Sequence, residues 1–205
     1  MRKHPAKPFF TPWLVSFSWL AVLAGLAGAS YWAWQRGHQP PATVGIYHEP
    51  GWMPEHKSNR WTCIVIHHSA CERGAAESFD EAHRKRGWDG LGYDFVIGNG
   101  SESGDGEVEV GFRWVRQIQG AHCKTDDQYY NEHGIGICLV GNLDNHPPDE
   151  KQLQSLVRLV DFLCAEFKIP PTEIYTHGGI TGKTACPGKD FNLAQLKQLV
   201  RRDAR

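Results

Sequence analysis

The feature that most limits the fold of this chain is a run of β-branched and apolar residues that ends in two histidines. Residues 62–67 read TCIVIH, and His68 follows directly. Apolar residues stand at consecutive positions, so a strand built from them needs cover on both of its faces. Strands of this kind occur in sheets that have helices packed on each side. The run therefore predicts a layered α/β domain.

Strand and helix patterns alternate along the rest of this domain. Strands are predicted at residues 93–98, 107–110, 134–142 and 173–177, which are separated by Gly, Asn and Asp turns. Helices are predicted at residues 75–87, 147–170 and 192–203, where apolar residues recur at helical spacing. The longest helix follows two prolines, with Asp149 as its expected N-cap residue. This order indicates a central sheet flanked by helices.

A long uncharged segment precedes the domain. Residues 13–34 read WLVSFSWLAVLAGLAGASYWAW, and about 20 apolar residues at a rise of about 1.5 Å each just span a hydrocarbon core of about 30 Å. Arg2, Lys3 and Lys7 come before it, and the positive-inside rule keeps such an end in the cytoplasm. We expect a single-pass transmembrane helix in the cytoplasmic membrane, with the remaining chain in the periplasm or extracytoplasmic space.

A cleaved signal peptide is the alternative for this segment, because residues 27–29 read AGA. The domain would then be secreted, but a cut there falls inside the apolar run, which favours the anchor. The expected organisation is a cytoplasmic tail at 1–12, the anchor or uncleaved signal at 13–34, a linker at 35–59 and the globular domain at 60–205. Pro, Gly, His and charged residues are frequent in the linker.

The charge of the exported part argues against a polyanionic partner. Of 22 Lys and Arg residues, three precede the apolar run, which leaves 19 against 23 Asp and Glu, a net charge of about −4. A nucleic-acid partner therefore has no electrostatic support, and none is expected.

Six cysteines in an exported domain raise the question of disulfide bonds. Cys63 and Cys138 lie in apolar runs, and Cys164 lies on the apolar face of a predicted helix, so these three are expected to pack in the core. Cys71 and Cys123 lie in polar loops, where they either pair with each other or remain free.

The sixth cysteine lies where burial does not explain it. Cys186 follows a polar loop, and His177 stands nine residues earlier in THGGITGKTACPGKDF. His67 and His177 each end a predicted strand, and ligands collect at the carboxyl ends of strands in open α/β sheets. Two imidazoles and a thiolate suit Zn²⁺, with the fourth position open to a water nucleophile. The spacing alone leaves a zinc site and unrelated residues equally open, and it does not choose between His67 and His68.

Five separated blocks of sequence add a family resemblance. IVIHHSA, HRKRGWDGLGYDFVIG, GAHC, GIGICLVGN and THGGITGKTACPGKDF occur in this order between about residues 61 and 199. In this respect the chain resembles the zinc-dependent N-acetylmuramoyl-L-alanine amidases of the type-2 class. Their fold, shared with peptidoglycan recognition proteins and phage amidase lysozymes, implies a central mixed β-sheet flanked by helices.

The resemblance implies roles for the residues of the metal site. His67, His177 and Cys186 match the positions of the zinc ligands. His68 would lie beside the metal and contact the substrate, with His68 as the ligand being the alternative.

Tyr93 matches the tyrosine that the family's amidases use near the attacking water, where a phenol can hydrogen-bond the developing oxyanion. Its alternative role is packing under the strand. Thr184 stands two residues before the cysteine, where active members carry Thr or Lys, and its hydroxyl would stabilise the same oxyanion. The neighbouring Lys183 can serve instead or bind the substrate.

His122 and Asn131 match positions that line the substrate groove, although His122 can instead bond the backbone. Two features depart from the family pattern. Asp94 stands where His or Asn is common, and the segment at 98–114 is longer than the usual turn. The longer segment is either a decorated hairpin or a loop that reshapes the groove.

The function that the resemblance implies is hydrolysis of the amide between N-acetylmuramic acid and L-alanine, in peptidoglycan or in muropeptides, by a monomeric catalytic domain. A non-catalytic peptidoglycan-binding module is the alternative, although such members often lose the cysteine that this chain keeps. A structural zinc site is a third reading, which would need a fourth protein ligand such as His68 or Cys71.

Overall fold

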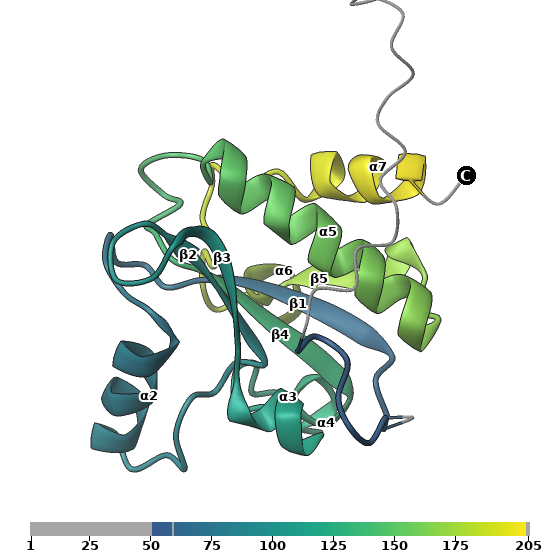
Figure 1. Ribbon diagram of the computed structural model, residues 1–205, viewed down its shortest axis with the longest axis horizontal. Coiled ribbons are helices and arrows are strands. Elements are labelled where there is room, and N and C mark those ends of the chain that lie inside the picture. Colours follow the sequence, from purple (N-terminus) through teal and green to yellow (C-terminus); the bar gives the residue numbers. More distant parts are fainter. Residues whose placement is uncertain (1–50, 59, 204–205) are drawn as a thin grey trace, which may run out of the picture. The chain divides into compact units, whose positions relative to one another are not determined.

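The fold was obtained as a computed structural model that describes residues 51–58 and 60–203 (Figure 1). The predicted tail, the apolar segment at 13–34 and most of the predicted linker lie outside the described residues. Among the residues that are described, no helix has the length and apolar character that a membrane crossing requires.

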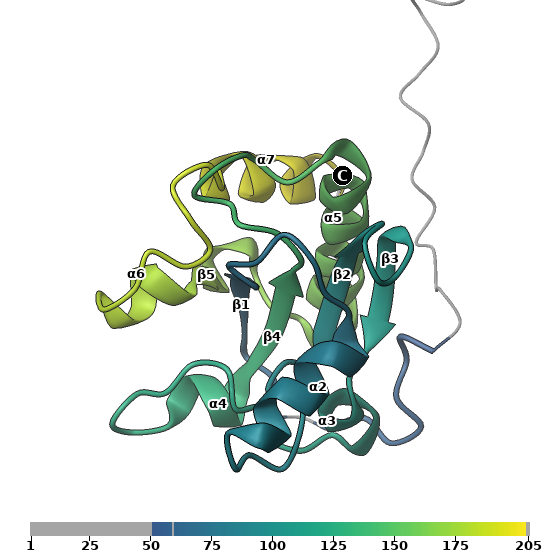
Figure 2. The same ribbon diagram turned by 90° about the vertical axis from the view of Figure 1, so that its left-hand side faces the viewer.

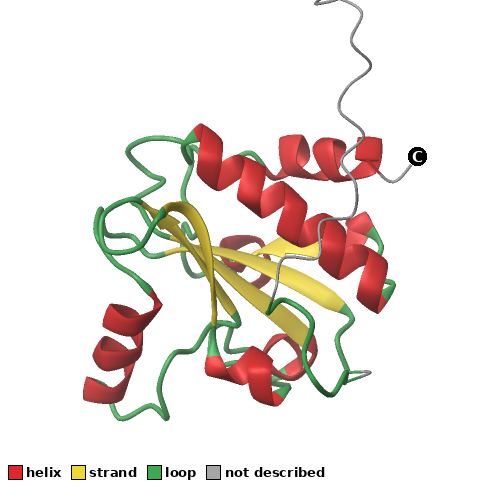
Figure 3. Ribbon diagram, in the orientation of Figure 1, coloured by secondary structure: helices red, strands yellow, loops and turns green. Residues whose placement is uncertain are grey.

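Five strands form one mixed sheet in the order β3-β2-β4-β1-β5, and the mixed sheet is the one that the family resemblance implied (Figure 3). The strands are β1 Cys63–His68, β2 Phe95–Asn99, β3 Asp105–Val110, β4 Gly134–Leu139 and β5 Ile174–Thr176. β1 runs parallel to both β4 and β5, and β4 runs parallel to β2. Only β3 is antiparallel, paired with β2 as a hairpin. The carboxyl ends of β1, β4 and β5 therefore meet at one edge of the sheet.

Helices cover both faces of this sheet. They are α2 Ala76–Lys85, α3 Phe112–Arg116, α4 Tyr129–His133, α5 Glu150–Phe167, α6 His177–Thr181 and α7 Leu193–Asp203, with a 3-10 turn at Pro171–Glu173. Figure 2 shows α2 on one side of the sheet and α5 on the opposite side. The layered arrangement follows from the continuous apolar character of β1, all six residues of which are buried.

The core divides into two clusters that follow the alternation of the strands. On the face covered by α5, Ile64, Ile66 and Phe95 join the apolar side of α5 in the larger cluster. On the other face, Val96 and Cys138 belong to a smaller cluster, against which Phe79 of α2 packs. Neighbouring residues of β2 thus point to opposite faces, as a period of two requires.

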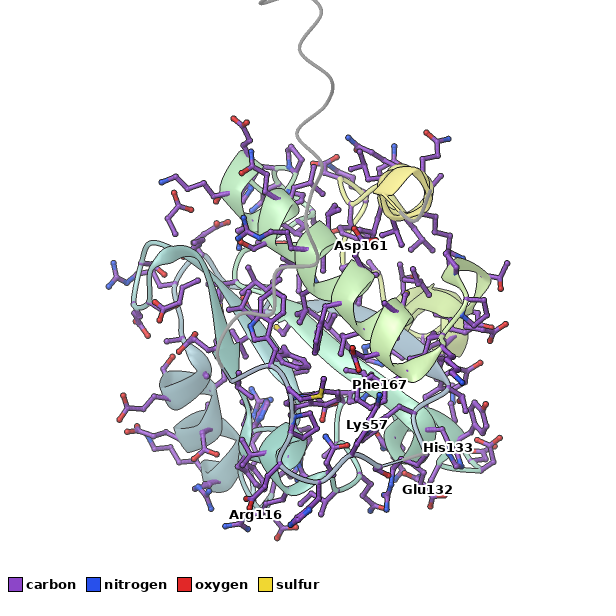
Figure 4. All side chains as sticks on the ribbon, turned by 45° about the vertical axis from the view of Figure 1, so that its right-hand side comes forward. Lys57, Arg116, Glu132, His133, Asp161 and Phe167 are labelled. Carbon is purple, nitrogen blue, oxygen red and sulfur yellow. The ribbon has the colours of Figure 1, made fainter. Side chains whose placement is uncertain are left out.

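The segment that precedes β1 packs on the domain. Trp52 is 3% exposed, its ring lies 5.7 Å from that of Phe162, and its carbonyl accepts a hydrogen bond from the indole N–H of Trp114. Lys57 pairs with Glu166 at 3.0 Å, and Figure 4 shows it beside Phe167 at the end of α5. The last residues of the predicted linker are therefore part of the folded domain.

Three short helices differ from the sequence-based prediction. α3, α4 and α6 have five residues each, too few to give a periodic apolar pattern. His177 begins α6 and does not end a strand, because β5 stops at Thr176. The long segment after β2 is a decorated hairpin that contains β3.

The cysteines of the described chain are all free thiols. Cys63 and Cys138 are buried, as expected for core residues. The predicted alternative of a bond between Cys71 and Cys123 is not formed: Cys71 is exposed and Cys123 is fully buried. A polar sequence context therefore did not place Cys123 at the surface.

Candidate metal centre

His67, His177 and Cys186 converge at the carboxyl edge of the sheet. One ligand atom from each residue lies within 4.8 Å of the others, and among the described residues no further His, Cys, Asp or Glu joins this group. His67 comes from the end of β1 and His177 from the residue after β5. Since β1 and β5 are adjacent and parallel, their ends bring the two imidazoles together.

The alternation of β1 decides which of its two histidines faces the site. Ile66 belongs to the cluster beneath α5, so the next side chain, that of His67, points to the opposite face. His68 returns to the first face, where its Nδ1 accepts a hydrogen bond from the backbone N–H of Leu143 at 3.1 Å. His68 thus braces a neighbouring loop, and its predicted contact with a substrate stays a prediction.

Backbone hydrogen bonds hold Cys186 against the two histidines. The carbonyl of Cys186 accepts from the N–H of Gly178 in α6 at 2.7 Å. Further along the same loop, the N–H of Lys189 donates to the carboxylate of Asp144 at 3.0 Å. The Cys186–Pro187 peptide bond is cis. The thiol sulfur of Cys186 lies 3.7 Å from Nδ1 of His67.

The electrostatics of the three residues fit a zinc site. Burial, together with the surrounding imidazoles, lowers the pKa of His67 well below its usual value, and burial also lowers the pKa of His177. Both imidazoles are therefore neutral, the form that binds a metal. Burial raises the pKa of Cys186 to about 11, while the backbone N–H of His68, 3.4 Å from the sulfur, favours the thiolate. A metal ion would replace the thiol proton.

Tyr93 lies directly beside the group. Its ring centroid is 5.2 Å from that of His67 and 5.7 Å from that of His83 on α2. Burial raises the pKa of Tyr93 well above 10, and a hydrogen bond with the thiol of Cys138 acts in the same direction, so its hydroxyl remains protonated. The tyrosine lines a cavity of about 330 Å³ between α2 and the loop after β1.

Thr184 and Lys183 line a larger cavity of about 620 Å³, together with His177. The hydroxyl oxygen of Thr184 accepts the backbone N–H of Cys186 at 3.2 Å, which leaves the hydroxyl proton free to donate. Of the three candidate ligands, His177 therefore borders this larger cavity, whereas Tyr93 borders the smaller one.

His122 and Asn131 line the larger cavity, but their polar atoms mainly bond the protein. Nδ1 of His122 lies 3.1 Å from Nε2 of His67. The amide oxygen of Asn131 accepts the backbone N–H groups of both His122 and Cys123. Their predicted roles in substrate binding stay predictions, and the visible role of Asn131 is to hold the loop that carries His122.

The larger cavity is also lined by Trp88 and Arg113, which the sequence analysis did not single out. Trp88 is 42% exposed, a high value for so large an apolar ring. Arg113 is 6% exposed, and its guanidinium donates to the carbonyls of Leu91 and Gln119. A large indole in a polar turn is the sequence signal that could have identified Trp88 as a cavity residue. The sequence carries no such signal for Arg113.

Comparisons with known proteins agree with this geometry. A family model described as Amidase_2, N-acetylmuramoyl-L-alanine amidase, matches residues 57–189. The endolysin of Enterobacteria phage T3 is 33% identical over 136 residues, which cover 62% of this chain and 81% of the endolysin. Peptidoglycan-recognition protein LB of Drosophila melanogaster is 28% identical over 145 residues, which cover 65% of this chain but only 57% of that protein.

Solved structures show the same fold. The N-acetylmuramoyl-L-alanine amidase LysC from Clostridium intestinale superimposes with a TM-score of 0.60 at 27% identity, covering 70% of this chain and 89% of LysC. A variant of Drosophila PGRP-LB in complex with tracheal cytotoxin superimposes with a TM-score of 0.54 at 25% identity, covering 71% and 85% of the two chains. With its His, His and Cys cluster at the edge of a mixed sheet, this chain belongs to the Amidase_2 family of N-acetylmuramoyl-L-alanine amidases.

Proposed function

We propose that this chain is a zinc-dependent hydrolase that cleaves the amide bond between N-acetylmuramic acid and L-alanine in peptidoglycan or muropeptides. The observation that carries the proposal is the set of three potential ligands, His67, His177 and Cys186, of which His177 also lines the larger cavity. Three protein ligands, with no fourth among the described residues, are typical of catalytic zinc sites and not of structural ones.

Zinc held by such ligands polarises a carbonyl group and makes water a nucleophile at neutral pH. The residues of the chain would complete the site. The hydroxyl of Thr184, already anchored by the N–H of Cys186, would donate its proton toward the oxygen of the reacting amide. The protonated phenol of Tyr93, next to His67, would donate to the same oxygen on exchanging its hydrogen bond with Cys138. Two such donors would stabilise the negative charge that develops on that oxygen.

The larger cavity would hold part of the substrate beside the ligands. Arg113, Lys124 and Lys183 line it against one carboxylate, that of Asp89, so its net charge complements an acidic ligand. The stem peptide of peptidoglycan carries carboxylates, and Trp88 would supply an apolar surface next to these cations. A cavity of about 620 Å³ is within the size range of small-ligand sites.

The proposal includes a location outside the cytoplasmic membrane, because the substrate lies there. Its support is the uncharged apolar segment at residues 13–34 and the basic residues before it. The segment would tether a monomeric catalytic domain to the membrane, or direct its secretion if it is cleaved.

The direct test is the release of new L-alanine amino termini from purified sacculi by the full-length chain. We expect release that stops when a zinc chelator is added and returns with added zinc. Cys186→Ser removes one ligand and should lower the rate by more than about 100-fold, since losing even an outer-shell partner costs 10–100-fold. His133→Gln, which removes a histidine outside the cluster, is the control and should retain full activity.

Soluble muropeptides, with and without the anhydro form of the sugar, separate the possible substrates. Cleavage of muropeptides alone would place the enzyme after the breakdown of the polymer. If a folded, zinc-loaded chain binds sacculi and muropeptides but releases no amine from either, the hydrolase proposal fails. The protein would then be a peptidoglycan-binding module.

A further inference from the structure

His122 occupies a slot that the chain leaves open for its ring. The side chain is 0% exposed, and a Cβ atom on either Gly120 or Gly136 would come within 2.8 Å of its Nε2. Both positions therefore need glycine for the imidazole to fit. The amide oxygen of Asn131 accepts the backbone N–H of His122 at 2.9 Å, which fixes the main chain from which the ring projects. The ring thus has one place and one orientation.

The hydrogen bonds of this ring determine where its proton lies. Nε2 of His122 is 3.2 Å from the carbonyl oxygen of Gly134, and a carbonyl oxygen can only accept. Nε2 therefore carries the proton. A charged imidazole is costly in a fully buried site, so Nδ1 of His122 has a lone pair and acts as an acceptor.

The same reasoning extends from His122 to the candidate ligand. Nδ1 of His122 lies 3.1 Å from Nε2 of His67, so Nε2 of His67 is the donor in this bond. The lone pair of His67 is then on Nδ1, which is the nitrogen that lies 3.7 Å from the sulfur of Cys186. The proton on His122 in this way selects the nitrogen of His67 that faces the site.

Asp94 favours the same arrangement through its charge. Its side chain is 0% exposed, and one carboxylate oxygen lies 4.0 Å from Nε2 of His122 while accepting the backbone N–H of Gly136 at 2.8 Å. The other oxygen has no hydrogen-bond partner among the described residues. A negative charge on this side stabilises a proton on Nε2 of His122 more than one on the distant Nδ1.

We propose that Asp94 and His122 are positioning residues, which together keep the proton of His67 on Nε2 and present its Nδ1 to the metal. The proposal rests on the zinc site described above but not on the reaction catalysed there. In many metal sites a carboxylate contacts the metal-binding histidine directly. Here a second histidine, His122, stands between the carboxylate of Asp94 and the candidate ligand His67. Asp94 also stands where the resemblance led us to expect His or Asn, so its contribution is a property of this chain.

Nitrogen NMR of the histidine rings tests the proton positions directly. We expect the zinc-free full-length chain, kept in detergent at about pH 8, to show His67 and His122 both protonated on Nε2. Asp94→Asn has nearly the same shape and still accepts from Gly136, but it has no charge. In this variant we expect part of the His122 population to move its proton to Nδ1. A zinc-free wild type with His67 protonated on Nδ1 would overturn the proposal.

Zinc affinity, measured by competition with a chromophoric chelator, tests the consequence for the metal. His122→Phe keeps a flat ring in the slot but removes the acceptor, and should bind zinc about 10–100-fold more weakly. Asp94→Asn should weaken binding less, by about threefold to tenfold within that outer-shell range. His133→Gln, which removes a histidine remote from the cluster, should bind zinc as the wild type does.

The outcomes separate this proposal from the proposed function. Wild-type zinc binding that neither variant changes would overturn the positioning role, whatever the activity on sacculi. If His122→Phe does not fold, the isosteric Asp94→Asn decides the question by its affinity and its proton positions together. A wild type that binds no zinc would overturn both proposals, whereas tight zinc binding with weakened variants and no hydrolysis would overturn only the hydrolase.

Discussion

Asp94 carries the most unusual single charge in the described chain. Its side chain is fully buried, one oxygen accepts a single backbone N–H, and the other has no hydrogen-bond partner among the described residues. Burial raises its pKa from 3.8 to about 7, although the N–H of Gly136 and the charge of Arg113 act in the opposite direction. A residue kept in such a place costs stability when it ionises, which is consistent with a role at the metal site.

The pKa of Asp94 gives a prediction about stability and pH. Between about pH 4 and 7 the folded protein retains a proton on this carboxyl that the unfolded chain releases, so the free energy of unfolding falls as the pH rises. At about 1.4 kcal/mol per pKa unit, the ionised carboxyl costs up to about 4 kcal/mol by pH 8. Asn cannot ionise, so we expect Asp94→Asn to be more stable than the wild type at pH 8 and to lose that advantage toward pH 4.

Urea unfolding of both zinc-free proteins, at several pH values and with a chelator present, measures this difference. Chelation keeps metal binding out of the comparison. A stability difference between Asp94→Asn and the wild type that does not change with pH would show that the carboxyl ionises normally in the folded state.

At the scale of elements, α5 combines a local feature, its N-cap, with long-range contacts to the sheet. Its sequence-predicted N-cap is confirmed, since the carboxylate of Asp149 accepts the backbone N–H of Gln152 at 2.8 Å. The side-chain amide of Gln152 donates to the carbonyls of Ile97 in β2 and of Val140, the residue after β4. The helix thus adds side-chain hydrogen bonds to buried carbonyl groups of the sheet.

We expect Asp149→Ala to lower the free energy of unfolding by about 1 kcal/mol, within the range of 0.5–2 kcal/mol that loss of an N-cap costs. The backbone N–H of Gln152 would lose its acceptor, while the metal site on the opposite face would remain intact. Chemical unfolding measures the effect, and Asp126→Ala, in an exposed loop, is the control. Equal stability of the two variants would mean that solvent replaces the cap without cost.

At the scale of the whole molecule, the open question concerns the residues before the domain. The apolar segment at 13–34 is long enough to span a membrane, and its partition into lipid would be driven by about 20 residues without charge. We expect the full-length chain to sediment with membranes and to resist extraction by salt or alkali. A variant without residues 13–34 should appear in the soluble fraction.

Protease added to intact spheroplasts tests the orientation of the same molecule. Digestion of the globular domain from outside is expected if the N-terminus is cytoplasmic. Protection of the domain until the cells are lysed would contradict the proposed location. A shortened soluble product that begins after residue 29 would show instead that the segment is a cleaved signal.

The sequence by itself determined the elements whose information is local. The apolar run of β1 required two covering layers, and the spacing of α5 with Asp149 before it marked a helix and its beginning. The residue types at His67, His177 and Cys186, strengthened by the family resemblance, indicated zinc before any distance was known. The inferences about β1 and α5 succeed because alternation, helical periodicity and capping depend on residues close together in the chain.

Only the tertiary structure decided which groups meet and what each one faces. The alternation of side chains along β1 turns His67 toward the site and His68 toward Leu143. Which of the two faces the site depends on which face of the sheet α5 covers. The contact of His122 with His67, and the burial of Asp94 beside it, join segments far apart in the sequence. No local pattern encodes such contacts, because they arise only when strands pair, loops close and water is excluded from the space between them.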